Sequence, residues 1–133
     1  MAYKGYLLKV NGMEFPGKYI SEKNYVVSPN QRIDLDSGRD ASGVLHRSVC
    51  QHMPVKIELQ TLPVDNEDIV LINSALGMTT QNIERTVEVE YYDMETDSYR
   101  TADCYMPNPQ FTINHCSENN IFYDAVRYAF IEY

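Results

Sequence analysis

Apolar and polar residues alternate with a period of two in several short stretches of the chain. Residues 55–62 place Val55, Ile57 and Leu59 on one face and polar side chains on the other. The same alternation recurs in residues 87–92, and residues 99–106 follow after the turn-forming run DMETDS. Side chains two residues apart share one face of a strand, so these patterns predict half-buried strands. The last two strands are predicted to pair as a hairpin.

Other β-rich stretches lie towards the two ends of the chain. Residues 6–10 and 13–15 flank Asn11-Gly12, a pair that tolerates positive φ and predicts a tight hairpin. Residues 18–28 are a further strand candidate, and residues 111–113 are a short one before the loop SENN. The closing residues 122–133 have few polar side chains on either face, which predicts a central strand covered on both sides.

One stretch, residues 65–77, carries helical spacing instead. Asp65 is a good N-cap residue, and acidic residues follow it in the first turn, where the helix dipole favours negative charge. Gly77 suits the position after the helix. The apolar residues of the predicted inner stripe are Ile69, Ile72, Ala75 and Leu76.

The predicted fold is therefore mainly β, with about seven to eight mostly antiparallel strands in a sandwich or barrel and one short flanking α-helix. The 133 residues suit a single domain, 1–133, without internal repeats or a linker. The hydrophobic fraction of 44% and the charged fraction of 23% are typical of a globular protein and argue against disorder.

Charge and composition narrow the function classes. The formal net charge of −8 disfavours binding of nucleic acid through a basic patch. No apolar run approaches membrane-spanning length, and the N-terminal apolar stretch is too short for a signal peptide, so we expect synthesis and folding in a cytoplasm. The aromatic residues are 11 Tyr and 4 Phe with no Trp, and tyrosine suits strands and interfaces.

Candidate chemistry is sparse. Cys50, His52, His115 and Cys116 are possible zinc ligands, but adjacent His and Cys rarely chelate one ion. Cys50 beside His46 or His52 is a possible nucleophile–base pair without a surrounding motif. We therefore predict no enzyme activity, no metal and no cofactor, and the three cysteines, Cys50, Cys104 and Cys116, are expected to be free and buried.

Residues 31–49 are the most distinctive segment. They are polar, contain two glycines, and carry arginines at both ends and in the middle. A catalytic loop, a phosphate cradle, a solvated hairpin tip and an assembly arm are the alternatives; the phosphate cradle lacks a Lys-Ser/Thr ending and a following helix. In the assembly reading, the segment is weakly ordered until it binds a neighbouring subunit. Its candidate interface residues are Arg32, Asp36, Arg39, Asp40 and Arg47.

The order of these elements resembles a family of small proteins encoded in the tail modules of tailed phages and prophages of Gram-positive hosts. The resemblance spans nearly the whole chain and includes the Arg-x-x-x-Gly-x-x-x-Arg pattern at Arg39, Gly43 and Arg47. It implies a tail-tube-like fold that assembles into hexameric rings, in which a long loop between early strands reaches an adjacent subunit.

The resemblance implies a structural, non-enzymatic virion protein made in the bacterial host cytoplasm. Its expected partners are further copies of itself and other phage tail proteins, with DNA passing through the lumen without being gripped and with no membrane contact. The acidic balance of the chain suits such a lumen, since negative walls repel phosphates. The alternative is a monomeric β-sandwich module that binds a carbohydrate or protein ligand through a tyrosine-rich face.

Overall fold

The computed structural model describes residues 3–133; residues 1 and 2 of the predicted domain lie outside the described part. Its principal element is a seven-stranded antiparallel sheet in the order β2-β1-β8-β9-β12-β6-β3. Two smaller ladders accompany it, β10-β11-β7 and β4-β5. The mainly β fold class with a single α-helix is confirmed.

Three hairpins or strand pairs follow the alternation in the sequence. Strands β1 (Leu8–Val10) and β2 (Met13–Glu14) are joined by Asn11 and Gly12, which have φ of 50° and 83° as the tight turn requires. Strands β8 (Thr86–Asp93) and β9 (Ser98–Tyr105) pair over their full length. Strand β6 (Lys56–Gln60) buries every second side chain, as predicted.

The closing strand lies in the centre of the sheet, as expected, but it is shorter than predicted. Strand β12 (Arg127–Glu132) pairs with β9 on one side and β6 on the other. The preceding residues form a separate strand, β11 (Ile121–Tyr123), which pairs with β7 (Val64–Asp65) and with β10 (Ile113–Cys116). The chain therefore passes from the small sheet to the main sheet between residues 124 and 126. The short strand predicted at residues 111–113 is displaced, because β10 begins only at Ile113.

The strand predicted over residues 18–28 is largely wrong. Two 3₁₀ turns, Gly17–Tyr19 and Glu22–Asn24, precede a short edge strand, β3 (Val26–Ser28). Between the two turns, Ile20 forms an isolated antiparallel bridge with Thr61, the residue that follows β6. Most of the segment therefore forms no strand, and Tyr19 and Ile20 are buried in the core.

The helix α1 (Asn66–Ala75) begins as predicted. The Asp65 carboxylate accepts a hydrogen bond of 2.8 Å from the Asp68 backbone N–H, and Gly77 follows with φ of 66°. Ile69, Ile72 and Leu76 are buried against the sheet. The helix is followed by a 3₁₀ turn at Met78–Thr80.

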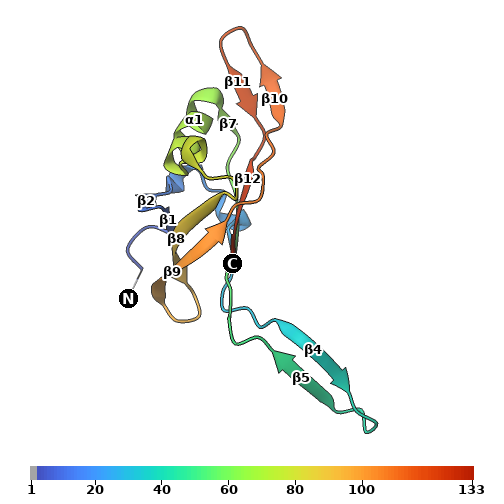
Figure 1. Cartoon of the computed structure of the whole chain (residues 1–133). Coiled ribbons are helices and arrows are strands. Elements are labelled where there is room, and N and C mark those ends of the chain that lie inside the picture. The colour runs from blue at the N-terminus through green and yellow to red at the C-terminus, as the bar shows by residue number, and fades with distance from the viewer. Residues whose placement is uncertain (1–2) are drawn as a thin grey trace.

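A single core joins the main sheet to the helix. Its largest fully buried side chains include Tyr128 and Phe130 of β12, and the Tyr128 hydroxyl donates a hydrogen bond of 2.8 Å to Asn73 of α1. Two hairpins project from this body at opposite ends (Figure 1): β4 (Asp34–Arg39) with β5 (Leu45–Val49) at the bottom, and β10 with β11 at the top. Within residues 3–133 no helix has the length and apolar character needed to cross a bilayer.

Candidate functional site

The predicted assembly segment forms a two-stranded hairpin, residues 34–49, which we call the arm. It stands away from the body (Figure 1), and every residue from 32 to 48 is exposed. Turn-forming residues are concentrated from Asp36 to Gly43, which predicts a turn there, but β4 continues through Gly38 to Arg39, and only residues 40–44 make the turn. The segment is therefore a paired hairpin, as the hairpin-tip alternative expects, and β4 extends further than the glycines and aspartates of the segment predicted.

The tip of the arm is built by Asp40 and Gly43. The Asp40 backbone N–H donates to the Val44 carbonyl at 2.9 Å, and the Gly43 N–H donates to the Asp40 carbonyl at 2.9 Å. The Asp40 carboxylate also accepts bonds from the Ser42 and Val44 backbone N–H groups. Gly43 has φ of 84°, a conformation that side-chain-bearing residues rarely adopt. Asp40, a predicted interface residue, therefore shapes the turn.

Two contacts between side chains lie along the arm. Arg47 donates two hydrogen bonds, of 3.1 and 2.8 Å, to one oxygen of Asp34 across the ladder. The His46 ring lies 2.8 Å from the second Asp40 oxygen, and this contact is the main cause that holds the pKa of Asp40 below its usual range. Arg47 is thus paired within its own hairpin, where the sequence suggested an intersubunit partner.

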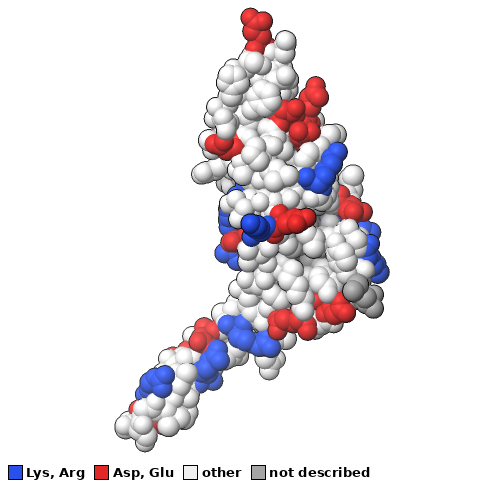
Figure 2. All heavy atoms as spheres, turned by 180° about the vertical axis from the view of Figure 1, so that it is seen from behind, with Lys and Arg blue, Asp and Glu red and all other residues white. Residues whose placement is uncertain are grey.

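Three other charged residues predicted for the interface have no ion pair within residues 3–133: Arg32, Asp36 and Arg39. The Arg39 guanidinium donates to the Gly43 carbonyl at 2.8 Å, and Arg32 donates to the Asn30 carbonyl. Both contacts use one nitrogen and leave other guanidinium N–H groups directed to the surroundings. Figure 2 shows basic side chains spaced along the arm.

Apolar side chains on the arm are also uncovered. Leu35 lies at a bulge in the ladder and is 66% exposed, and Val44 and Leu45 are 54% and 44% exposed. An isolated two-stranded hairpin is at best marginally stable in water. Because the body covers neither face of the arm, the arm presents backbone edges, leucines and guanidinium groups to whatever surrounds it.

The root of the arm, by contrast, is anchored. The Gln31 backbone N–H donates to the Pro54 carbonyl at 3.0 Å, and the Cys50 N–H donates to the Ile33 carbonyl at 2.8 Å. The Asn30 amide donates to Asp93 at 3.1 Å and to Glu95 at 3.2 Å, both in or beside the β8–β9 turn. These contacts fix the direction in which the arm leaves the body.

Asp93 is fully buried at this root. Arg100 donates to the Asp93 carboxylate at 3.1 Å, and the Glu95 backbone N–H donates to it at 2.9 Å. Burial by itself would raise the pKa of Asp93, but the surrounding donors outweigh it and hold the pKa below its usual range. Sequence analysis missed this site, because Asp93 looks like one more acidic turn residue.

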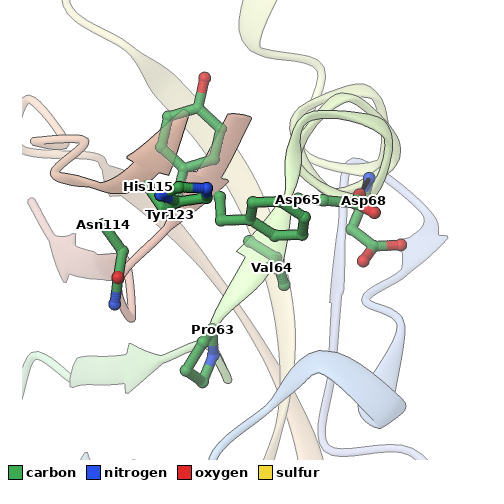
Figure 3. A pocket seen from close by; sticks show the side chains of 8 residues that line it. Pro63, Val64, Asp65, Asp68, Asn114, His115 and Tyr123 are labelled. Carbon is green, nitrogen blue, oxygen red and sulfur yellow. Dashed lines mark hydrogen bonds between the residues drawn. The ribbon is translucent and has the colours of Figure 1, made fainter. Parts of the chain in front are cut away.

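A cavity that the sequence did not indicate lies at the opposite end of the molecule, between α1 and the β10–β11 hairpin. Its volume is about 520 Å³. Figure 3 shows His115 and Tyr123 on the hairpin side and Asp65 and Asp68 on the helix side. The residues that line it are Pro63, Val64, Asp65, Asp68, Asn114, His115, Phe122 and Tyr123.

Comparison with known proteins places the chain in a family. It matches the model of a family of unknown function, DUF6711, over residues 1–133. The chain belongs to DUF6711. No curated protein and no solved structure matches it.

The possible zinc ligands of this DUF6711 protein lie in two separate places. Cys50 and His52 are near the arm root, where the His52 ring bonds to the Tyr133 carbonyl at 2.7 Å. His115 and Cys116 lie on β10, in the hairpin at the other end (Figure 1). The predicted burial of the cysteines is correct for Cys104 alone among the three: Cys50 is half-buried, and Cys116 is exposed because it lies on the projecting hairpin. Within residues 3–133 no three His, Cys, Asp or Glu side chains are grouped as metal ligands would be.

The tyrosines that suggested a ligand-binding face are packed on one another. The Tyr6 and Tyr99 ring centroids are 4.7 Å apart at an angle of 31°, and Tyr92 meets Tyr99 edge-on at 5.6 Å. The Tyr6 hydroxyl donates to Glu90 at 2.6 Å, which raises the pKa of Tyr6 to about 12. The Tyr6, Tyr92 and Tyr99 rings therefore pack against one another, and they do not form a flat surface on which a sugar ring could stack.

Proposed function

We propose that this DUF6711 protein is a non-enzymatic structural component of a bacteriophage tail, which assembles with copies of itself into rings. The observation that carries the proposal is the arm, a hairpin exposed along residues 32–48. A segment with uncovered leucines and two free backbone edges gains most of its stability from a neighbour. In the proposed virion, that neighbour is another subunit of the tail.

The remainder of the fold supports assembly as well. The main sheet ends in the short edge strands β2 and β3, which have two and three residues. Short edges limit uncontrolled strand addition, and a ring needs such control at each subunit boundary. Val26 on β3 and Met13 on β2 are exposed at 49% and 57%, so both edges present apolar side chains.

The charge of the chain suits the same role. A formal net charge of −8 repels phosphate groups, so DNA passing through a ring of such subunits would not be held. The resemblance in element order to tail-module proteins, together with the mainly β fold flanked by one helix, supports a phage tail as the assembly in which the protein acts. The carbohydrate-binding alternative has less support, since the Tyr6, Tyr92 and Tyr99 rings cover one another.

The test is to remove the arm. Ile33 and Cys50 are joined by a backbone hydrogen bond of 2.8 Å, so residues 34–49 can be replaced by an Asn-Gly turn without disturbing the body. We expect the parent to form rings at high concentration, visible by negative-stain microscopy and light scattering, and the arm-excised variant to remain monomeric with a similar melting temperature. Mass spectrometry of purified virions should detect the parent.

Two results would overturn the proposal. One is a parent protein that stays monomeric at high concentration and is absent from purified virions of the phage or prophage that encodes it. The other is an arm-excised variant that forms the same rings as the parent, which would make the arm irrelevant to assembly.

A further inference from the structure

The two projecting hairpins lie at opposite ends of the molecule (Figure 1), and arginines are present on the arm and absent from the β10–β11 hairpin. The end opposite the arm is formed by α1 and by the β10-β11-β7 sheet. We call this end, residues 61–84 and 107–126, the acidic end. It contains no Lys or Arg and six carboxylates: Asp65, Glu67, Asp68, Glu84, Glu118 and Asp124.

The arm offers guanidinium groups that have no carboxylate partner. The arm and its root hold three Arg and three Asp and are neutral overall, but Arg32 and Arg39 have no ion pair within residues 3–133. Two other arginines border the acidic end: Arg85 donates to the Gln81 side chain at 3.2 Å, and Arg127 is paired with Glu58 at 2.7 Å. No Lys or Arg is among the residues that line the cavity, so its carboxylates are complementary to the unpaired arginines of the arm.

The acidic end also has an uncovered strand edge. Strand β10 is the outer strand of the β10-β11-β7 sheet, and its second edge is unpaired within the part of the chain that the structure describes. Ile113 on this strand and the neighbouring Phe111 are 53% and 43% exposed. An extended segment from another chain can add to such an edge through main-chain hydrogen bonds, with apolar side chains filling adjacent space.

The cavity beside this edge offers that space. Phe122 lines it and is 41% exposed, and His115 stacks on Phe122 with ring centroids 6.1 Å apart. Asp65 and Asp68 face it from the other side (Figure 3). An aromatic wall opposite carboxylates suits a segment that carries both a leucine and a guanidinium group, and Leu45 and Arg39 are paired directly across the arm ladder.

We propose that the arm of one copy docks on the acidic end of a neighbouring copy, with Arg39 directed to the carboxylates of the cavity and Leu45 towards Phe122. This inference rests on the proposed self-assembly and names its second surface. Because the two surfaces differ and lie at opposite ends, the contact is heterologous and continues from copy to copy. Every copy then has one arm engaged and one acidic end occupied, except at the ends of an open chain.

The test compares three proteins. The arm-excised variant keeps the acidic end and lacks the arm. An acceptor variant, Ile113→Lys with Glu118→Lys, keeps the arm and adds positive charge to two exposed positions of the β10–β11 hairpin. The control, Thr101→Lys with Glu88→Lys, makes the same change in charge at exposed positions of β9 and β8, away from both surfaces. Circular dichroism and melting curves establish that each protein folds.

We expect the acceptor variant to associate about tenfold more weakly than the parent or worse, and the control to associate as the parent does. The decisive experiment mixes the arm-excised and acceptor variants. At a concentration at which each variant alone is monomeric, the mixture forms a complex of one copy of each, because one intact arm meets one intact acidic end. Light scattering gives the mass of this complex, and raised salt weakens it by screening the charges.

The outcomes separate the two proposals. An acceptor variant that assembles like the parent, beside an arm-excised variant that does not, overturns the acidic end as the docking surface and leaves the arm's role intact. A mixture that forms no heterodimer overturns the head-to-tail contact. Parent-like assembly of the arm-excised variant overturns the proposed function itself.

Discussion

The side-chain amide of Asn30 donates a hydrogen bond of 3.1 Å to the buried carboxylate of Asp93. This bond joins Asn30, at the root of the arm, to Asp93, the last residue of β8, although the two residues are far apart in the sequence. The direction of the arm is thus set by a contact with the sheet.

Replacing Asn30 by Gly should weaken this link without straining the backbone. Asn30 has φ of 50°, a conformation that glycine adopts readily, so the substitution removes only the amide. We expect the free energy of unfolding, measured by urea denaturation, to fall by about 1–3 kcal/mol, because a buried carboxylate loses a donor. Asn119→Gly, in the exposed turn at residues 117–120, is the control and should change stability by less than about 0.5 kcal/mol. Equal effects of the two substitutions would contradict the role of the Asn30–Asp93 bond.

The charge of Asp93 should make part of the stability depend on pH. Its pKa in the folded protein lies below the usual value of about 3.9, so its ionised form stabilises the fold above that pH. This contribution disappears as the pH falls through the folded pKa. The parent should therefore exceed Asp93→Asn in stability at neutral pH, and the difference should shrink below about pH 4. A difference that stays constant down to about pH 3 would show that ionisation of Asp93 does not matter.

Much of the fold follows from local patterns. The alternation around Ile57 and Val89 predicts strands that the structure contains, and Asp65 and Gly77 mark the two ends of the helix correctly. Residues 122–133 are different, because their β-rich composition is uniform. The split into β11 and β12 is decided by pairing with β7 and β6, which are distant in sequence, and local alternation carries no such information.

The sequence predicts which residues make up the candidate site, but it does not predict their secondary structure. Gly38 and the aspartates around it are poor strand formers, so the sequence predicted turns where cross-strand pairing makes an extended hairpin. The cavity at the other end joins residues near 64 and 122, and the burial of Asp93 depends on Asn30. Both features arise when segments far apart in sequence meet, and one sequence shows no signal for them.

The hydroxyl of Tyr128 should stabilise the contact between sheet and helix. It donates to the Asn73 side chain at 2.8 Å from an almost fully buried ring. Tyr128→Phe keeps the ring and should lower the free energy of unfolding by about 1 kcal/mol, as loss of one such bond typically does. Tyr128→Ala also empties the core at that point and should cost about 3–5 kcal/mol. A phenylalanine variant as unstable as the alanine variant would contradict this division between hydrogen bond and packing.

Replacing Arg39 and Arg47 together by Ala should impair assembly while leaving the body folded. Both side chains are exposed, and their bonds go to Gly43 and Asp34 within the arm. We expect a melting temperature close to that of the parent and a clear loss of rings by light scattering. A double substitution of the exposed Lys4 and Lys23 by Ala makes the same change in net charge outside the arm, and should leave assembly intact. Unfolding of the arginine variant would mean that the arm supports the body, which contradicts its described separation.

The two glycines of the arm provide a matched pair for testing whether its shape matters. Gly43 lies at the tip with φ of 84°, whereas Gly38 lies in β4 without a positive φ, and an added Cβ meets no atom within 4 Å at either position. Gly43→Ala therefore strains the backbone of the turn, while Gly38→Ala only restricts the unfolded chain.

We expect Gly43→Ala to disturb the tip, seen as faster amide exchange at Asp40 and Val44, and to reduce assembly without changing the melting of the body. Gly38→Ala should retain slow exchange and assemble at least as well as the parent. Both variants add the same methyl group to the same exposed hairpin. A difference in their assembly would therefore show that assembly depends on the shape of the tip. Equal assembly of the two variants would show that the neighbouring copy does not contact the tip, and that docking depends on the strands of the arm and on Arg39 instead.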